Sequence, residues 1–274
     1  MSDTLLVQPS AAPRAQRVVG TVLRSREIAV LSVLLLVIAA ATFKSHGFLF
    51  SSDGWRDLLL TPSILLLLAV GQTVVIITRN VDLSVGSTLG LTAYLTGRLF
   101  SDHPGLPIVV VFLAAIAFGA VLGLVNGVLV AFGKVPALVI TLGTLYIYRG
   151  AFLTWAGSDR INASDLPSGF LDLGTKQILT IPVLTIIALV VLCAVAYYLQ
   201  TARGGRELYA IGSDPEAATL YGLKVTRRVV SAFVLCGALA GLAGVLYAAR
   251  YGTISSNAGI NIELQAVGAA VIGG

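Results

Sequence analysis

Long apolar runs separated by short polar segments dominate the chain from about residue 28 onward. About 20 apolar residues form a helix that crosses a hydrocarbon layer of roughly 30 Å. The runs lack the period-two alternation of barrel strands, which favours helices whose backbone groups are satisfied internally. The runs lie at about 28–43, 58–78, 83–100, 107–132, 135–155, 178–199 and 229–249, and an eighth begins near Leu264.

This pattern predicts an all-α fold, a polytopic transmembrane helix bundle with about eight visible spans. The eighth run stops at Gly274 after too few residues to cross a bilayer. We therefore expect that a C-terminal portion is missing. Breaks in helical structure are expected near Pro62 and Asp82.

Composition and charge agree with a lipid environment. Of 274 residues, 57% are hydrophobic and 11% charged, against about a quarter charged in soluble domains. The net charge of +5 could indicate nucleic acid, but the basic residues flank apolar runs and act as topology signals. We expect membrane lipid as the surroundings and no nucleic acid as a partner.

The same basic residues predict the orientation. With the N-terminus inside, eleven lie on the inner side and six on the outer side, which favours a cytoplasmic N-terminus. Residues 1–26 then form a cytoplasmic leader and residues 27–274 a transmembrane permease domain, incomplete at its C-terminus. The polar stretch 200–228 lies in the cytoplasm, and 156–177 lies outside.

Side chains suited to catalysis are scarce. The thirteen acidic residues lie in loops or at span edges, whereas an ion-coupled carrier needs ionisable groups at membrane depth. Gly133 and Lys134 do not form a phosphate-binding loop, because Val135 follows and Val128 replaces the first glycine. We expect no catalytic residue, no metal site and no cofactor, with any ATP hydrolysis in another subunit.

Two runs carry glycines at helix-packing spacing. They are Gly119, Gly123 and Gly127 in the run 107–132, and Gly237, Gly241 and Gly244 in the run 229–249. Small residues let helix backbones approach closely in lipid. Packing within the bundle is the default interpretation, and a dimer seam is the alternative.

The cytoplasmic stretch contains a short, strongly punctuated helix. Asp214 can cap it, Pro215 suits the first position, and Gly222 can end it. About two turns are unstable alone in water, so the helix must dock, either on its own bundle or on a partner. The residues assigned to this contact are Asp214, Pro215, Glu216, Ala217, Ala218, Leu220, Tyr221 and Gly222, with Ala217, Ala218, Leu220 and Tyr221 expected to be exposed.

Four ordered motifs carry a family resemblance. They are Gly-Arg-Glu-Leu-Tyr-Ala-Ile-Gly (205–212) leading into Asp-Pro-Glu-Ala-Ala, Gly-Ala-Leu-Ala-Gly-Leu-Ala-Gly (237–244), residues 78–87, and residues 134–150. Together they resemble permeases of bacterial ABC sugar importers, the branch that serves ribose, arabinose, xylose, rhamnose and autoinducer-2. The amino-acid sequences of 78–87 and 134–150 most resemble those of the autoinducer-2 and rhamnose permeases.

The resemblance implies a membrane-spanning subunit that imports a sugar or sugar-like solute across the bacterial plasma membrane. It implies that Asp214 to Tyr221 is a coupling helix seated on an ABC ATPase subunit. Further implied partners are a periplasmic or lipid-anchored solute-binding protein and a second permease copy or homologous permease. Rival classes are an ion-coupled carrier or channel without ATPase partners, and a membrane-embedded enzyme.

Polar residues inside the runs are candidates for the translocation pathway. Ser84, Thr88 and Thr92 share one helical face, and hydroxyls offer a sugar weak, replaceable hydrogen bonds. The alternative is that these hydroxyls bond to their own helix. The full set is Gln72, Asp82, Ser84, Thr88, Thr92, Asn126 and Arg149. For Gln72 and Asn126 the alternative is helix-to-helix contact, for Asp82 a helix cap, and for Arg149 snorkelling or pairing.

Overall fold

The computed structural model describes residues 26–45, 47–133 and 135–273. The predicted leader lies outside the described residues except for Arg26, as do Lys134 and Gly274. The chain divides into two compact units, Met1–Trp55 and Arg56–Gly274. The first unit contains α2 (Arg26–Lys44), α3 (Gly47–Phe50) and the first residues of α4.

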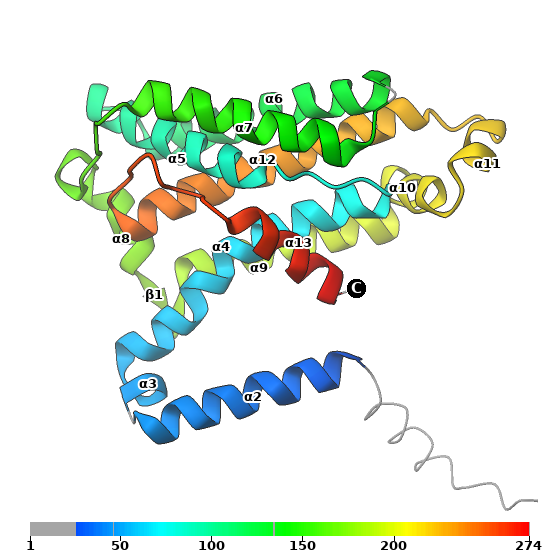
Figure 1. Ribbon diagram of the computed structural model, residues 1–274. Helices are drawn as coiled ribbons and strands as arrows, with labels where there is room; N and C mark the ends of the chain where they lie inside the picture. The colour runs from blue at the N-terminus through cyan, green and yellow to red at the C-terminus, as the bar shows by residue number, and fades with distance from the viewer. Residues whose placement is uncertain (1–25, 46, 134, 274) are drawn as a thin grey trace, which may run out of the picture. The chain divides into compact units, whose positions relative to one another are not determined.

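The second unit is almost entirely helical (Figure 1). Its elements are α4 (Ser52–Ile77, which begins in the first unit), α5 (Val85–Asp102), α6 (Ile108–Gly133), α7 (Ala137–Ala156), the 3₁₀ helix η1 (Ala163–Asp165), α8 (Ser168–Thr175), β1 (Gln177–Ile178), β2 (Ile181–Pro182), α9 (Val183–Thr201), α10 (Arg203–Ser213), α11 (Pro215–Leu220), α12 (Val225–Tyr251) and α13 (Ile262–Gly273).

Five of the described helices are long and apolar enough to cross a membrane: Gly54–Ile77, Ile108–Gly133, Ala137–Ala156, Val183–Thr201 and Val225–Tyr251. The all-α, polytopic class is therefore confirmed, whereas the count of eight spans is not. The run expected to begin at 178 starts later as a helix. Residues 177–182 instead form a two-residue antiparallel strand pair, and Leu179 and Thr180 make its turn with φ values of 49° and 70°.

Helix α12 is the central element of the second unit and packs along α6 and α5. Gly237 lies against Gly119 and Gly123, and Gly241 lies against the backbone of Ala115. A Cβ on Gly237 would collide with the Gly119 carbonyl oxygen. The glycines on α6 and α12 thus serve packing inside one chain, as the default interpretation predicted.

One of the two expected helix breaks is present. Helix α4 continues through Pro62, so the break predicted there is wrong. Residues 78–84 are not helical and separate α4 from α5. At this junction the Thr78 hydroxyl donates to the Val75 carbonyl at 2.7 Å, and Arg79 has a φ of 62°.

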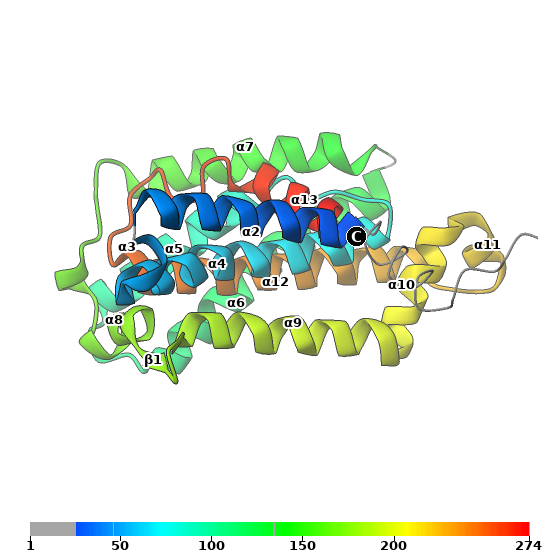
Figure 2. The same ribbon diagram turned by 90° about the horizontal axis from the view of Figure 1, so that it is seen from below.

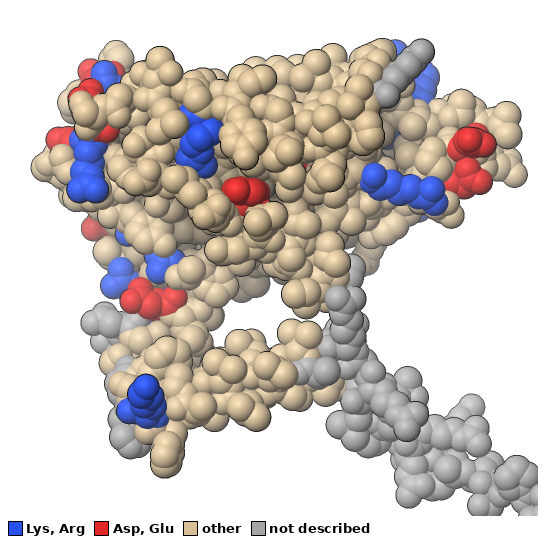
Figure 3. All heavy atoms as spheres, viewed as in Figure 1, with Lys and Arg blue, Asp and Glu red and all other residues tan. Residues whose placement is uncertain are grey.

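Charged and apolar surfaces are separated in the second unit. Helices α10 and α11 lie at one end, past the end of α9, in both ribbon views (Figures 1 and 2). On the face shown in Figure 3, Lys, Arg, Asp and Glu lie mainly toward the two ends of this unit, and the surface between them is mostly uncharged, with a basic and an acidic group within it. Large apolar side chains are exposed along α6, α7 and α9, among them Leu113, Leu138 and Val190. Such a surface is suited to lipid.

Candidate functional site

Helix α11 has the capping geometry that its sequence predicts. Asp214 is the N-cap residue, and its carboxylate accepts hydrogen bonds from the amides of Glu216 and Ala217, both at 3.0 Å. Pro215 occupies the first helical position, where its missing N–H costs nothing. Gly222 follows the helix with a φ of 77°, a conformation that glycine adopts without strain.

The exposed face of α11 is narrower than expected. Leu220 and Tyr221 are 89% and 87% exposed, whereas Ala218 is only 4% exposed. The expectation that Ala218 is exposed is therefore wrong. The physical reason is that α11 contacts α10 and α12, so that one side of this short helix must face the protein. Glu216, Leu220 and Tyr221 remain on the outer side.

Helix α10 connects this surface to the end of α4. The Arg79 guanidinium donates from Nε to the carbonyl of Gly212 and from Nη2 to that of Ser213, both at 2.5 Å. A Cβ on Gly212 would collide with the Ile77 carbonyl oxygen, so the two backbones are in close contact. Sequence reasoning treated 200–213 as a polar loop and did not single out Arg79. Gly205, Leu208 and Ile211 recur every three residues, and all three are buried. This helical spacing is the feature of the sequence that could have predicted α10.

A second contact joins α10 to the start of α12. Glu207 pairs with Arg228 at 2.5 Å and with Arg203 at 2.7 Å. The hydrogen bond from Arg228, followed by that from Arg203, holds the pKa of Glu207 below its usual value. The α10–α11 segment is thus attached to α4 through Arg79 and to α12 through Glu207.

A buried polar centre lies where the α4–α5 junction meets α6. Asp82 is 1% exposed, although the sequence placed it at a span edge. Its Oδ1 accepts from the amide and hydroxyl of Ser84 at 2.9 and 2.7 Å, and from Asn126 Nδ2 at 3.3 Å. The N-cap of α5 is Ser84, so Asp82 lies two residues before the cap position predicted for it.

Gln72 and Asn126 complete the buried polar centre. Gln72 Nε2 donates to the Asp82 carbonyl, and Gln72 Oε1 accepts the Asp82 amide at 3.4 Å. Asn126 Nδ2 also donates to Ser84 Oγ at 2.7 Å. The structure therefore brings together four of the predicted pathway residues: Gln72, Asp82, Ser84 and Asn126.

Two residues of α7 contact the same centre and were not predicted. The Tyr148 hydroxyl donates to Asn126 Oδ1 at 3.3 Å and to the Leu122 carbonyl at 2.9 Å. The Thr141 hydroxyl donates to the Val81 carbonyl at 3.1 Å. Their spacing of seven residues places Thr141 and Tyr148 on one face of α7. This shared polar face is the feature of the sequence from which both could have been predicted.

The side chains of the remaining candidates form no hydrogen bond with this centre in the described residues. Thr88 and Thr92 are 2% and 0% exposed, and the Thr92 hydroxyl donates to the carbonyls of its own helix at Thr88 and Leu89, as the alternative interpretation held. Arg149 donates to the Ala258 carbonyl at 2.7 Å. It lines a separate cavity of about 330 Å³ together with Asn257, Asn261 and Glu263.

Comparisons with known proteins identify relatives of this chain. A family model described as branched-chain amino acid transport system, permease component, matches residues 56–274. The chain is 36% identical over 262 residues to the autoinducer 2 import system permease protein LsrC of Enterobacter sp. (strain 638), covering 93% of this chain and 73% of the relative. No solved structure matches.

Two further relatives carry the same name. The LsrC protein of Salmonella typhimurium is 40% identical over 214 residues, covering 78% of this chain and 60% of the relative. That of Escherichia coli O157:H7 is 36% identical over 250 residues, covering 91% of this chain and 72% of the relative. The chain thus spans between about three fifths and three quarters of the length of these relatives.

Proposed function

Because the chain belongs to the family of branched-chain amino acid transport permeases, we propose that it is the membrane subunit of an ATP-driven importer for a sugar-like solute. Family membership indicates a transport subunit rather than an enzyme. Autoinducer-2 is the first candidate solute, because it is named in the relatives, and rhamnose and the pentoses are the others. The partners are an ABC ATPase subunit, a solute-binding protein, and a second copy or homologue of the permease.

The proposed topology places residues 27–274 in the membrane with a cytoplasmic N-terminus and a cytoplasmic coupling loop at 200–228. The count reaches eight spans if three helices are added to the five long apolar ones: α2, α5, and α13 as the beginning of an eighth span. For α5 this rests on its 18 residues and extensive burial, which let it cross among other helices rather than in direct contact with lipid.

The observation that carries the proposal is the exposed tip of α11. A capped two-turn helix presents Leu220 and Tyr221 almost fully to solvent, and large apolar side chains exposed side by side are typical of a contact with another protein. We assign them, with Glu216, to a groove of the ATPase subunit. Asp214, Pro215 and Gly222 shape the helix, and Ala217 and Ala218 seat it on the permease.

Movement of α11 reaches the bundle through α10. A push on α11 acts on Gly212 and Ser213, whose carbonyls hold Arg79, and Arg79 leads directly into the junction that carries Asp82. The buried polar centre can exchange hydrogen-bond partners when α4, α5 and α6 shift, so it suits alternating access. We assign Gln72, Asp82, Ser84 and Asn126 to this moving centre, and Thr88, Thr92 and Arg149 to the path beside it.

One observation favours the rival class. Asp82 is a carboxylate buried among membrane-spanning helices, and such groups bind coupling ions in carriers. An ion-coupled carrier would transport solute in vesicles that contain this chain without an ATPase. It would also respond to a proton or sodium gradient.

The test compares two double variants of the permease in detergent, each co-expressed with its ATPase subunit. Leu220→Asp with Tyr221→Asp removes the exposed apolar tip, and Ile178→Asp with Leu179→Asp alters two adjacent exposed apolar positions at the β1–β2 turn, outside the long apolar helices. We expect the ATPase to be lost from the first variant and retained by the second. Equal recovery with both variants, or transport in vesicles free of ATPase, would contradict the proposal.

A further inference from the structure

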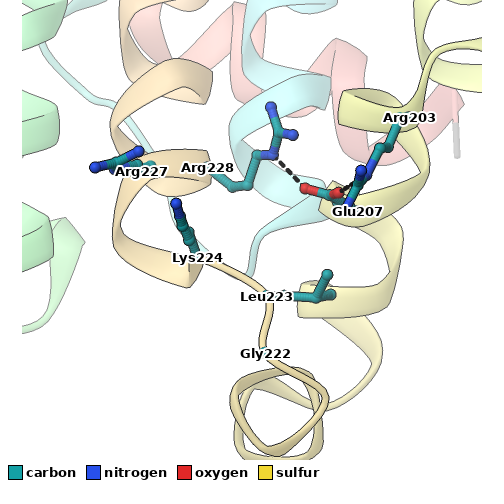
Figure 4. Close-up of a pocket in the computed structure, with 7 residues that line it drawn as sticks. All are labelled: Arg203, Glu207, Gly222, Leu223, Lys224, Arg227 and Arg228. Atoms are coloured by element: carbon teal, nitrogen blue, oxygen red, sulfur yellow. Dashed lines mark hydrogen bonds and ion pairs between the residues drawn. The ribbon is translucent and has the colours of Figure 1, made fainter.

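A basic pocket opens between α10 and the start of α12. It is a cavity of about 400 Å³ lined by Arg203, Glu207, Gly222, Leu223, Lys224, Arg227 and Arg228. Figure 4 shows that Arg203 and Glu207 come from α10, while Lys224, Arg227 and Arg228 come from the beginning of α12 and the residue before it. The pocket contains four basic side chains and one acidic side chain.

The positive charge of this basic pocket is only partly balanced. Glu207 is shared between Arg228 and Arg203, so its one carboxylate already has two partners. Lys224 and Arg227 form no hydrogen bond or ion pair with their side chains in the part of the chain that the structure describes. Figure 4 shows Arg227 directed away from Glu207. Two cations are therefore available for an anionic ligand.

The basic pocket lies at the level where apolar spans give way to polar chain. Helix α9 ends at Thr201 and α12 begins at Val225, and both are apolar enough to cross a membrane. Tyr197, 70% exposed, lies one turn before the end of α9, and aromatic residues favour the headgroup region of a bilayer. A ligand in this pocket would therefore lie beside lipid headgroups.

We propose that the basic pocket binds the phosphodiester of an anionic phospholipid. Guanidinium and ammonium groups donate strong, charge-assisted hydrogen bonds to phosphate oxygens, and basic pockets beside membrane helices suit lipid headgroups. The acyl chains would lie along the exposed apolar surface of α9, which includes Leu189 and Val190. The leaflet is the cytoplasmic one if the topology proposed above holds, but the binding itself does not depend on that function.

Phosphate chemistry could also come from a soluble ion, so the experiment separates the two sources. The detergent-purified chain is titrated with phosphatidylglycerol, with phosphatidylcholine and with inorganic phosphate, and bound lipid is measured by native mass spectrometry. We expect phosphatidylglycerol to bind more tightly than phosphatidylcholine, with no displacement by millimolar phosphate. Displacement by free phosphate, or equal binding of both lipids, would overturn the proposal.

Variants locate the binding within the basic pocket. Lys224→Gln with Arg227→Gln should weaken phosphatidylglycerol binding about tenfold or more. Arg160→Gln with Lys176→Gln removes the same charge from exposed positions outside the pocket and should change it little. Glu207→Gln should strengthen binding, a gain that misfolding cannot produce. Equal losses in both double variants, or displacement of the lipid by the ATPase subunit, would refute the assignment.

Discussion

Asp82 shows how a single acidic side chain is accommodated inside an apolar bundle. Burying a carboxylate is costly unless donors replace the lost water. Here the amide and hydroxyl of Ser84 and the amide of Asn126 all donate to Oδ1, and Asp82 forms no ion pair within the described part of the chain. All the hydrogen bonds of the Asp82 side chain in the described part of the chain therefore end on a single acceptor atom, Oδ1.

This arrangement predicts different outcomes for two substitutions of Asp82. Asp82→Asn keeps the Oδ1 acceptor, so its thermal unfolding midpoint in detergent should stay within about 2 °C of the unchanged protein. Asp82→Leu leaves the buried donors of Ser84 and Asn126 unsatisfied, which should cost about 2 kcal/mol and lower the midpoint by roughly 4–8 °C. A midpoint for the leucine variant equal to that of the asparagine variant would contradict this role.

The sequence could predict which residues form the buried polar centre, but it could not predict that they contact one another. Gln72, Asp82, Ser84 and Asn126 stand out because they are polar in apolar surroundings. Which of these side chains touch depends on the angles and positions at which α4, α5 and α6 cross. The hydrophobic pattern of the sequence does not determine that crossing geometry. Arg149 looks equally conspicuous in the sequence and yet contacts the Ala258 carbonyl.

At the scale of helices, close backbone approach holds α12 to α6. Gly237 has the Cα of Gly123 at 2.8 Å from the position of an added Cβ, a distance that backbone atoms cannot easily increase. Gly143 on α7 has no atom within 4 Å of such a position. The two glycines therefore form a matched pair for substitution.

We expect Gly237→Ala to destabilise the protein and Gly143→Ala to leave it unchanged or slightly more stable. The added methyl group at Gly237 forces α6 and α12 apart, which typically costs about 1–3 kcal/mol, while alanine favours the helix at both positions. Thermal unfolding in one detergent measures both variants. Equal midpoints would show that the close contact between α6 and α12 contributes little to stability.

The sequence predicts the bounds of a helix well where the length of an apolar run determines them. It predicts them poorly where contacts between distant parts of the chain determine them. The run 107–132 became Ile108–Gly133 and the run 135–155 became Ala137–Ala156, because apolar length is the determining property. The polar stretch 200–228 instead folded into α10, α11 and the first turn of α12. Its helix α10 is held by contacts that are distant in sequence, the hydrogen bonds from Arg79 and the ion pair between Glu207 and Arg228.

On the scale of the whole second unit, one continuous set of contacts joins the exposed tip of α11 to the buried polar centre. Leu220 is the last residue of α11 and Tyr221 is its C-cap, and only Asp214 separates α11 from Ser213, the last residue of α10. Arg79 holds the Gly212 and Ser213 carbonyls and lies three residues before Asp82. A displacement of α11 can therefore reach α4 and α5 through this guanidinium, through the close backbone contact of Gly212 with Ile77, or through α12.

Arg79→Ala should reduce the number of solute molecules imported per ATP hydrolysed, by about tenfold, because two charge-assisted hydrogen bonds are lost. ATP hydrolysis and co-purification of the ATPase should persist, since the tip of α11 is unaltered. Both activities are measured together in proteoliposomes containing the complete transporter.

Arg206→Ala provides the control, because Arg206 is also a basic residue near this segment but donates within its own region, to the Thr201 carbonyl. It should leave the ratio of transport to hydrolysis unchanged. If Arg79→Ala transported normally, the Arg79 hydrogen bonds would not be the route, and the displacement would have to pass through the Gly212–Ile77 contact or through Glu207 and α12. If the ATPase were lost as well, Arg79 would position α11 rather than transmit its movement.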